Sequence, residues 1–127
     1  MTEDNKVVVG SIVWQVLTVP DAEGLKDFYA EVTGWAPRAC SLGEYDDYEM
    51  CLPETNECVA GVCHARGTNA NLPPVWLIYI QVKDVEESAK RCLELGGEVV
   101  DGPKALGSQK ICVIRDPSGA VSAIVGN

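Results

Sequence analysis

Histidine, long apolar runs and positive charge are scarce in this 127-residue chain. It holds one histidine, His64, so a single chain cannot supply two histidine ligands to a metal. No apolar run approaches the roughly 20 residues that a membrane-spanning helix needs. The 10 Lys and Arg residues face 19 Asp and Glu residues, which gives a formal net charge of -9. Because such a surface repels phosphate backbones and anionic lipid, we expect no nucleic-acid partner and no membrane partner.

The start of the chain also lacks the secretory pattern of a basic segment followed by an apolar stretch. We therefore expect a cytoplasmic protein of bacterial type, in which cysteines are reduced and mostly buried thiols. A zinc site can be drawn from Cys51, Cys58, Cys63 and His64, but they lack a Cys-x-x-Cys spacing and lie on expected strands, which disfavours it. The six cysteines are Cys40, Cys51, Cys58, Cys63, Cys92 and Cys112.

What is present is the composition of one ordinary globular domain, with 46% hydrophobic and 23% charged residues. A chain of this length can bury about two-thirds of its unfolded surface, so it can form a core without disulfides or metal. We therefore expect residues 1–127 to form a single domain.

The chain reads as one unit used twice, at an offset of 63 residues. Residues 12–19 and 75–82 are β-rich runs, and each is followed by an aspartate that suits a helix N-cap, Asp21 and Asp84. An amphipathic helix pattern ending in glycine follows each aspartate. The pairs matched at this offset are Val19 with Val82, Asp21 with Asp84, Val32 with Leu95, and Gly34 with Gly97.

Three shorter strands are expected after each helix, which makes each half a βαβββ unit. The halves are residues 11–66 and 75–127, and the Pro-containing stretch 67–74 links them. A helix covers only one face of a four-stranded sheet, so two halves side by side would enclose a cleft with their other faces. The expected shorter strands are residues 39–41, 45–52, 57–65, 98–101, 110–115 and 120–125.

Three stretches of the sequence resemble the vicinal-oxygen-chelate superfamily of glyoxalases, bleomycin-resistance proteins and extradiol dioxygenases. VWQVLTVPDAEGLKDFYAEVTGW and WLIYIQVKDVEESAKRCLELGGEVV resemble the openings of its two halves, and VIRDPSGAVSAIV resembles its closing hairpin. The resemblance covers nearly the whole chain and implies an α+β fold of tandem βαβββ repeats that form curved mixed sheets around a cleft. It also implies a homodimer. It does not choose between the enzymes and the metal-free antibiotic-binding proteins of the superfamily.

The resemblance also indicates where a metal would bind. Metal-dependent members carry a histidine at the start of each half and a glutamate near the end of each half. The two histidine positions match Trp14 and Leu77, and the closing glutamate matches Ala123. The remaining position falls near Gly61 or Cys63. Because tryptophan, leucine and alanine offer no lone pair to a divalent ion, we expect no metal and no other cofactor.

Successive side chains of a strand point to opposite faces of the sheet. If Trp14 faces the cleft, the residues two and four positions further along its strand face the cleft as well. The resulting lining is apolar and aromatic with a few polar groups, which suits a small organic molecule. Trp14 and Tyr79 could stack on a ring or a cationic group. The expected ligand-binding residues are Trp14, Val16, Thr18, Tyr48, Met50, Leu77, Tyr79, Gln81 and Ala123.

These observations favour a metal-independent protein of the glyoxalase/bleomycin-resistance type that sequesters an aromatic or cationic compound. We favour a binding protein over an enzyme, and no catalytic residue is identified. One alternative is a lyase, isomerase or dioxygenase with a displaced site around His64, Tyr48 and nearby carboxylates. Another is an interaction protein whose cleft is filled by core residues. The carboxylates are Glu44, Asp46, Asp47 and Glu49, which on strands are also typical of a solvated edge.

Overall fold

A computed structural model describes residues 8–127, apart from the side chain of Thr68. The chain divides into two compact units. The first unit is Trp14–Trp76, and the second joins Leu77–Asn127 to the described residues that precede Trp14. No helix among residues 8–127 is long and apolar enough to cross a membrane.

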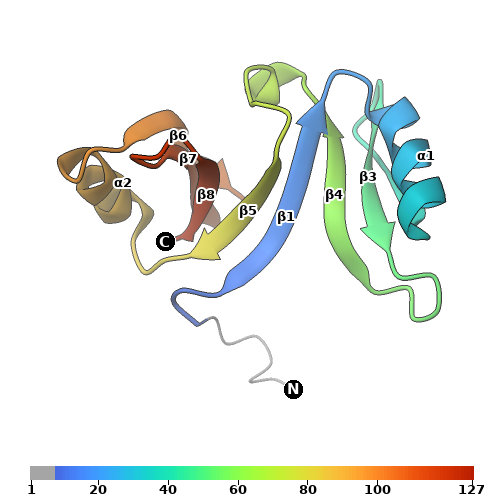
Figure 1. Cartoon of the computed structure of the whole chain (residues 1–127), viewed down its shortest axis with the longest axis horizontal. Coiled ribbons are helices and arrows are strands. Elements are labelled where there is room, and N and C mark those ends of the chain that lie inside the picture. Colours follow the sequence, from blue (N-terminus) through green and yellow to red (C-terminus); the bar gives the residue numbers. More distant parts are fainter. Residues whose placement is uncertain (1–7) are drawn as a thin grey trace. The chain divides into compact units, whose positions relative to one another are not determined.

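The first unit is a βαβββ repeat (Figure 1). Its elements are β1 (Ile12–Val19), α1 (Ala22–Thr33), β2 (Ala36–Ser41), β3 (Asp46–Cys51) and β4 (Cys58–His64). The strand order is β2-β3-β4-β1, in which β1 runs parallel to β4 and the other pairs are antiparallel. A short 3-10 helix, η2 (Gly67–Asn69), follows β4. The first expected repeat is therefore confirmed.

The second unit repeats the same order of elements (Figure 1). Its elements are β5 (Trp76–Gln81), α2 (Val85–Glu94), β6 (Glu98–Leu106), β7 (Gln109–Arg115) and β8 (Val121–Gly126). The strand order is β5-β8-β7-β6, with β5 parallel to β8. The α+β class with tandem βαβββ repeats is therefore confirmed.

Strand β6 is longer than the sequence indicates. The expected strand stops at residue 101 because Gly102 and Pro103 are poor strand formers. In the structure, pairing with β7 shifts register between Val99 and Asp101 and again between Asp101 and Lys104. These irregularities accommodate the glycine and proline and let the strand continue to Leu106.

Both helices start and stop where local chemistry predicts. The Asp21 carboxylate accepts a hydrogen bond from the Gly24 amide at 3.0 Å, and the Asp84 carboxylate accepts one from the Glu87 amide at 3.0 Å. Helix α1 ends at Gly34, whose φ of 84° is a left-handed conformation that favours glycine. These contacts satisfy backbone groups that a helix end would otherwise leave without partners.

Each helix packs on one face of the four strands of its own repeat and forms a separate core. The core at α1 contains the fully buried side chains of Ala22, Met50, Ala60 and Val62, with Tyr48 beside them. Aromatic rings at the edge of this core include Trp76, whose indole N–H donates to the Tyr29 hydroxyl at 3.1 Å. The corresponding core under α2 contains Val85, Ala89, Cys112 and Ile124.

Candidate functional site

The first unit presents a second sheet face, on the side away from α1. Val19 packs with the α1 core, so the alternating residues Trp14, Val16 and Thr18 of β1 point to the opposite face. We call this the Trp14 face. A methyl group placed on Gly61 would lie 3.6 Å from Trp14 Nε1 and 3.5 Å from Val16 Cγ2. Trp14 and Val16 therefore lie over the position where Gly61 has no side chain.

Two carboxylates share the Trp14 face. Glu49 pairs with Gly61 across β3 and β4, so its side chain emerges on the same face. Asp47 lies two residues earlier on the same strand and therefore faces the same way. Its carboxylate accepts a hydrogen bond from the His64 amide at 2.8 Å. The face thus combines an indole ring packed against Gly61 with two acidic groups.

A thiol also lies on this face. Cys63 pairs with Thr18 on β1 and its side chain contacts Asp47. Burial, assisted by the negative charge of Asp47, raises the pKa of the Cys63 thiol to about 12. Nucleophilic cysteines need a lowered pKa, so this raised pKa argues against a nucleophilic role for Cys63.

The face prediction is wrong for Tyr48 and Met50. Both pack in the core under α1, where they are 8% and 0% exposed. The Lys26 ammonium of α1 lies 5.1 Å from the centre of the Tyr48 ring. Tyr48 pairs with Val62, and Asp47 and Glu49 take the positions on the Trp14 face. Alternation within β3 could not show this, because it depends on the register between β3 and β4.

Four of the expected residues share one face of the second unit. Tyr79 pairs with Ala123, while their neighbours Ile80 and Ile124 pair on the other side, where Ile124 packs under α2. By alternation, Leu77 and Gln81 point with Tyr79, away from α2. Leu77, Gln81 and Ala123 are buried and Tyr79 is half-buried. The cleft between the halves involves both units and stays a prediction.

Of the residues named for the alternative displaced site, the structure brings together His64, Tyr48 and Asp47. His64 Nδ1 lies 2.9 Å from the Asp46 carbonyl oxygen and 3.5 Å from Asp47 Oδ1. The His64 ring also contacts the rings of Tyr45 and Tyr48, with centres 5.4 Å and 6.4 Å apart. With Nδ1–H donating to the carbonyl, Nε2 keeps its lone pair.

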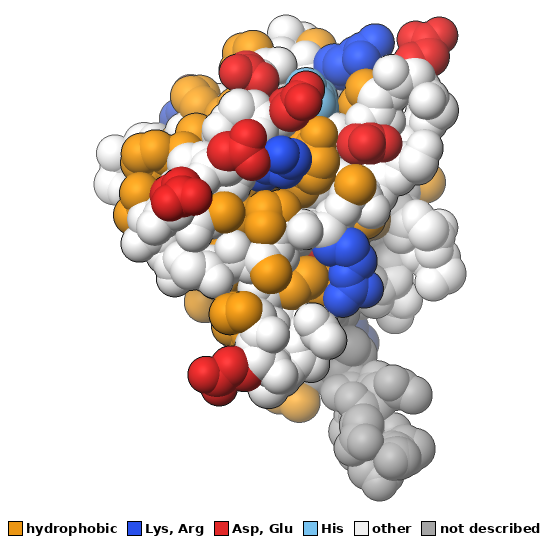
Figure 2. Space-filling view, turned by 90° about the vertical axis from the view of Figure 1, so that its right-hand side faces the viewer, with side chains coloured by type: hydrophobic (Ala, Val, Ile, Leu, Met, Phe, Trp, Pro, Cys, Tyr) orange, Lys and Arg blue, Asp and Glu red, His pale blue; other side chains and the backbone are white. Residues whose placement is uncertain are grey.

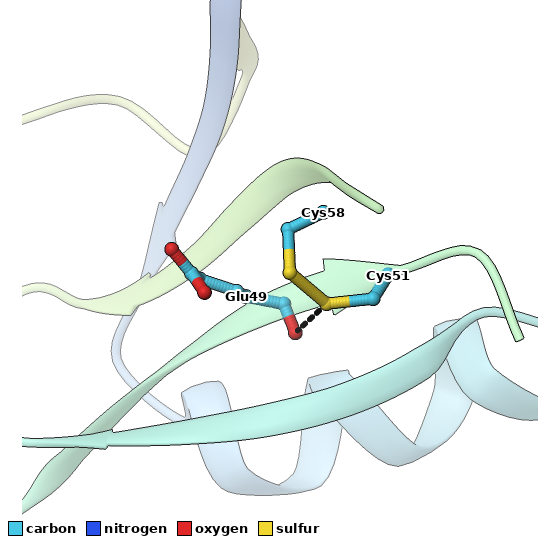
Figure 3. A group of neighbouring side chains, drawn as sticks. All are labelled: Glu49, Cys51 and Cys58. Atoms are coloured by element: carbon cyan, nitrogen blue, oxygen red, sulfur yellow. Dashed lines mark hydrogen bonds between the residues drawn. A yellow bond between two sulfur atoms is a disulfide. The ribbon is translucent and has the colours of Figure 1, made fainter. Parts of the chain in front are cut away.

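The cysteines differ from the sequence expectation at one pair. Cys51 and Cys58 form a disulfide across the β3–β4 hairpin, so the expectation of reduced thiols is wrong for these two (Figure 3). The hairpin turn between the two strands brings their Cα atoms to 3.8 Å of each other. The hairpin could have indicated this disulfide from the sequence, because two cysteines on neighbouring strands can lie opposite each other. The cysteines recorded as free thiols are Cys40, Cys63, Cys92 and Cys112.

The positions where the resemblance would place metal ligands do not fit a divalent ion. The Trp14 indole lies against Gly61, and neither residue has a side-chain lone pair to donate. Leu77 and Ala123 are buried apolar residues. Of the positions that the resemblance indicates, only the alternative Cys63 carries a donor atom, and one thiol does not make a metal site.

Two hollows within the units lie apart from the expected ligand-binding residues. A hollow of about 520 Å³ lies at the start of α1, and one of about 440 Å³ lies in the second unit. The first is lined by Val19, Pro20, Asp21, Gly24, Leu25 and Phe28. The second is lined by Glu86, Pro103, Lys104, Ala105, Ser108, Gln109, Lys110 and Asn127.

Comparison with curated proteins finds bacterial relatives. Anthracycline biosynthesis protein DauV of Streptomyces sp. (strain C5) is 28% identical over 91% of this chain and 46% of its own length. DnrV of Streptomyces peucetius, also named an anthracycline biosynthesis protein, is 29% identical over 93% of this chain and 42% of its own length. Putative glyoxylase CFP32 of Mycobacterium tuberculosis is 27% identical over 87% of this chain and 43% of its own length. The chain spans less than half the length of these relatives.

Solved structures show the same fold. A methylmalonyl-CoA epimerase of Streptomyces coelicolor, in complex with 2-nitronate-propionyl-CoA, aligns with a TM-score of 0.56 and 14% identity over 94% of this chain and 99% of its own. The methylmalonyl-CoA epimerase of Mycobacterium tuberculosis aligns with a TM-score of 0.54 and 14% identity over 94% of this chain and 92% of its own.

The family comparison covers most of the chain. The family model described as "Glyoxalase/Bleomycin resistance protein/Dioxygenase superfamily" matches residues 11–123, which include the strands and helices of both repeats except the end of β8. Together with the repeat and the topology, this match identifies the chain as a member of the glyoxalase/bleomycin resistance protein/dioxygenase superfamily.

Proposed function

We propose that this protein binds a small planar aromatic molecule that carries positive charge, on the Trp14 face and without a metal. The observation that carries the proposal is the half-buried Trp14 indole packed against Gly61, with Asp47 and Glu49 on the same face. An indole offers a stacking surface for a ring or a cation. The carboxylates would attract the positive charge, and Thr18 offers a hydroxyl.

Two further facts support a cationic aromatic ligand. The chain has a net charge of -9, which raises the local concentration of cations. Acidic groups also occur away from the Trp14 face: on the side of α1, which Figure 2 shows, acidic side chains are dispersed among apolar ones. Two relatives are named for anthracycline biosynthesis, and anthracyclines contain a planar fused-ring system.

The second unit would contribute the face that carries Tyr79. Leu77, Gln81 and Ala123 lie on that face, so it offers an aromatic ring, an amide and apolar surface. The protein would sequester the compound as a homodimer in the cytoplasm. The chemistry of this lining is that of a binding pocket for an organic molecule.

The test is calorimetric titration with an anthracycline that bears an amino sugar, alongside its uncharged aglycone. We expect saturable binding, tighter for the charged compound. Trp14→Ala should abolish measurable heat. Gly61→Ala should bind nearly as wild type, because its methyl group would make ordinary contacts of 3.5 and 3.6 Å. Gly61→Val should lose at least about tenfold in affinity, or about 1.4 kcal/mol, because a larger side chain must displace the indole.

The matched control is Tyr48→Phe, which changes a buried residue on the face covered by α1. It should bind like wild type. Equal binding by wild type and Trp14→Ala would contradict the proposal, provided that circular dichroism shows both proteins folded. Binding lost in Tyr48→Phe but kept in Trp14→Ala would move the site to the other face of the sheet.

The arrangement of His64 favours a second candidate function, an enzyme of the lyase, isomerase or dioxygenase type. The Nδ1 contact with the Asp46 carbonyl leaves Nε2 as a proton acceptor, and Asp47 lies 3.5 Å from the ring. A suitable probe is methylmalonyl-CoA in deuterated water, since this ester is the ligand named for one structural neighbour. Deuterium incorporation that is lost in His64→Ala would favour the enzyme. Incorporation that persists in His64→Ala would remove His64 from the reaction.

A further inference from the structure

Three residues of metal-ligand type lie together at one end of the β3–β4 hairpin. In Figure 3 the backbone oxygen of Glu49 faces the Cys51 sulfur, while the Glu49 carboxylate extends away from the disulfide. Glu49, Cys51 and Cys58 each offer one ligand atom, and these three atoms lie within 4.8 Å of one another. The two cysteines pair across adjacent strands, with Cα atoms 3.8 Å apart. Because the sheet holds both strands, the two sulfur atoms stay near each other when the disulfide is reduced.

The Glu49 carboxylate is available to complete such a site. Among the residues that the structure describes, it has neither a hydrogen-bond donor nor a salt-bridge partner. Glu49 is also half-buried on its strand, which limits how far the side chain can move away. Two thiolates and one carboxylate form a ligand set that suits Zn²⁺, and water can take the fourth position.

A cation beside the cluster balances its charge. Arg38 Nη2 donates to the Asn56 carbonyl oxygen at 3.1 Å, and the Cys58 sulfur lies 3.8 Å from the same oxygen. The guanidinium and the Cys58 sulfur therefore share the Asn56 carbonyl oxygen as a neighbour. Two thiolates and a carboxylate around a divalent ion carry a net charge of -1, which Arg38 offsets.

We propose that the Cys51–Cys58 pair is a redox switch that creates a metal site: the disulfide form binds no metal there, and the dithiol form binds Zn²⁺ together with Glu49. This goes beyond the proposed function and does not depend on it. Metal binding to the dithiol releases two thiol protons to water.

The switch needs a dithiol reductant, such as a dithiol protein. A thiolate of the reductant attacks the Cys58 sulfur, which is partly exposed, whereas Cys51 is 3% exposed. Cys51 leaves as a thiolate and a mixed disulfide forms. The second thiol of the reductant then displaces Cys58. The protein disulfide gains two electrons, and the reductant ends as a disulfide.

The test uses Co²⁺ as a spectroscopic probe on the full chain. One sample is reduced with a dithiol, freed of reductant and kept without oxygen; the other is left oxidised. The reduced protein should bind about one Co²⁺ per chain, with thiolate-to-cobalt absorption that Zn²⁺ abolishes. The oxidised protein should show no such absorption. Equal absorption by both samples, or none by either, would overturn the proposal.

Variants locate the site and test the switch separately. Cys58→Ser should abolish the thiolate-to-cobalt absorption seen for the pair. Glu49→Gln should keep part of it but weaken Co²⁺ binding by at least about tenfold, the lower end for loss of a supporting group. The matched control is Cys63→Ser, on the same face of β4, which should bind Co²⁺ like wild type. Absorption that survives Cys58→Ser and disappears in Cys63→Ser would overturn the assignment.

Counting thiols in denatured protein tests the disulfide itself. The oxidised chain should show reactive thiols only at Cys40, Cys63, Cys92 and Cys112, and the reduced chain should show all six cysteines. Six reactive thiols in protein oxidised under mild conditions would overturn the switch, even if Co²⁺ binds.

Discussion

Gly61 decides what can lie on the Trp14 face. A side chain at this position would contact Val16 and Trp14, so glycine lets the indole lie close to the strand. Glu49, the partner of Gly61 on β3, emerges on the same face. The packing of the ring beside a carboxylate therefore depends on one missing side chain.

Met50 is a core residue, and its substitution should separate stability from binding. Met50→Ala removes a fully buried side chain beneath α1, which should lower the free energy of unfolding by about 2–5 kcal/mol. Urea unfolding measures this loss. Ligand affinity, measured below the unfolding transition, should be unchanged, because Met50 lies on the opposite face from Trp14. A loss of affinity without a loss of stability would contradict this placement.

Asp116 makes the turn between β7 and β8 sensitive to pH. Hydrogen bonds from the Ser118 hydroxyl, and from the Ser118 and Ala120 amides at 2.8 and 3.0 Å, lower the pKa of the Asp116 carboxyl. A carboxyl whose pKa is lowered by folding stabilises the fold above its unfolded pKa and loses this effect as pH falls through its folded pKa.

Asp116→Asn should therefore be less stable than wild type at pH 7, and the difference should shrink below about pH 4. Urea unfolding at several pH values measures it. Ser118→Ala removes the main hydrogen bond and should show a smaller change in the same direction. A difference that grows on acidification would contradict the role given to this carboxylate.

Among the elements, helices α1 and α2 occupy the same position in the two repeats, so substitution of their N-cap residues should change stability to a similar extent. Asp21 and Asp84 each cap a helix through one backbone amide. Asp21→Ala and Asp84→Ala should each lower the free energy of unfolding by about 1 kcal/mol, while Asp→Asn at the same positions should cost much less. Chemical denaturation of the four variants checks this. Equal losses for alanine and asparagine would show that the caps do not stabilise the helices.

Much of each element could be predicted from sequence, because the signals are local. N-caps, alternation in β1 and β5, and the 63-residue offset gave both repeats and the common face of Trp14, Val16 and Thr18. Tyr48 and Met50 were assigned to the wrong face because their orientation depends on how β3 pairs with β4. The same register brings Glu49 beside Gly61. The disulfide was missed because a missing secretion pattern says nothing about the distance between two cysteines.

At the scale of the whole molecule, net charge should govern how binding responds to salt. With a net charge of -9, the protein should attract a cationic ligand less as ions screen it. Between about 0.01 M and 0.15 M salt the screening length falls from about 30 Å to about 8 Å. Affinity for the charged anthracycline should fall over this range, and affinity for the uncharged aglycone should not. Equal salt dependence would argue against the carboxylates as the attracting groups.

The most direct measurement of the central claim is a ¹H–¹⁵N spectrum of the labelled protein during titration with the charged anthracycline. The chain has three tryptophans, and their indole N–H signals report different places: Trp14 lies over Gly61, whereas Trp35 and Trp76 pack around Tyr29. If the ligand binds on the Trp14 face, the Trp14 indole and Gly61 amide signals move together and saturate, while those of Trp35 and Trp76 stay in place. Movement of the Trp35 and Trp76 signals with Trp14 unchanged would contradict it.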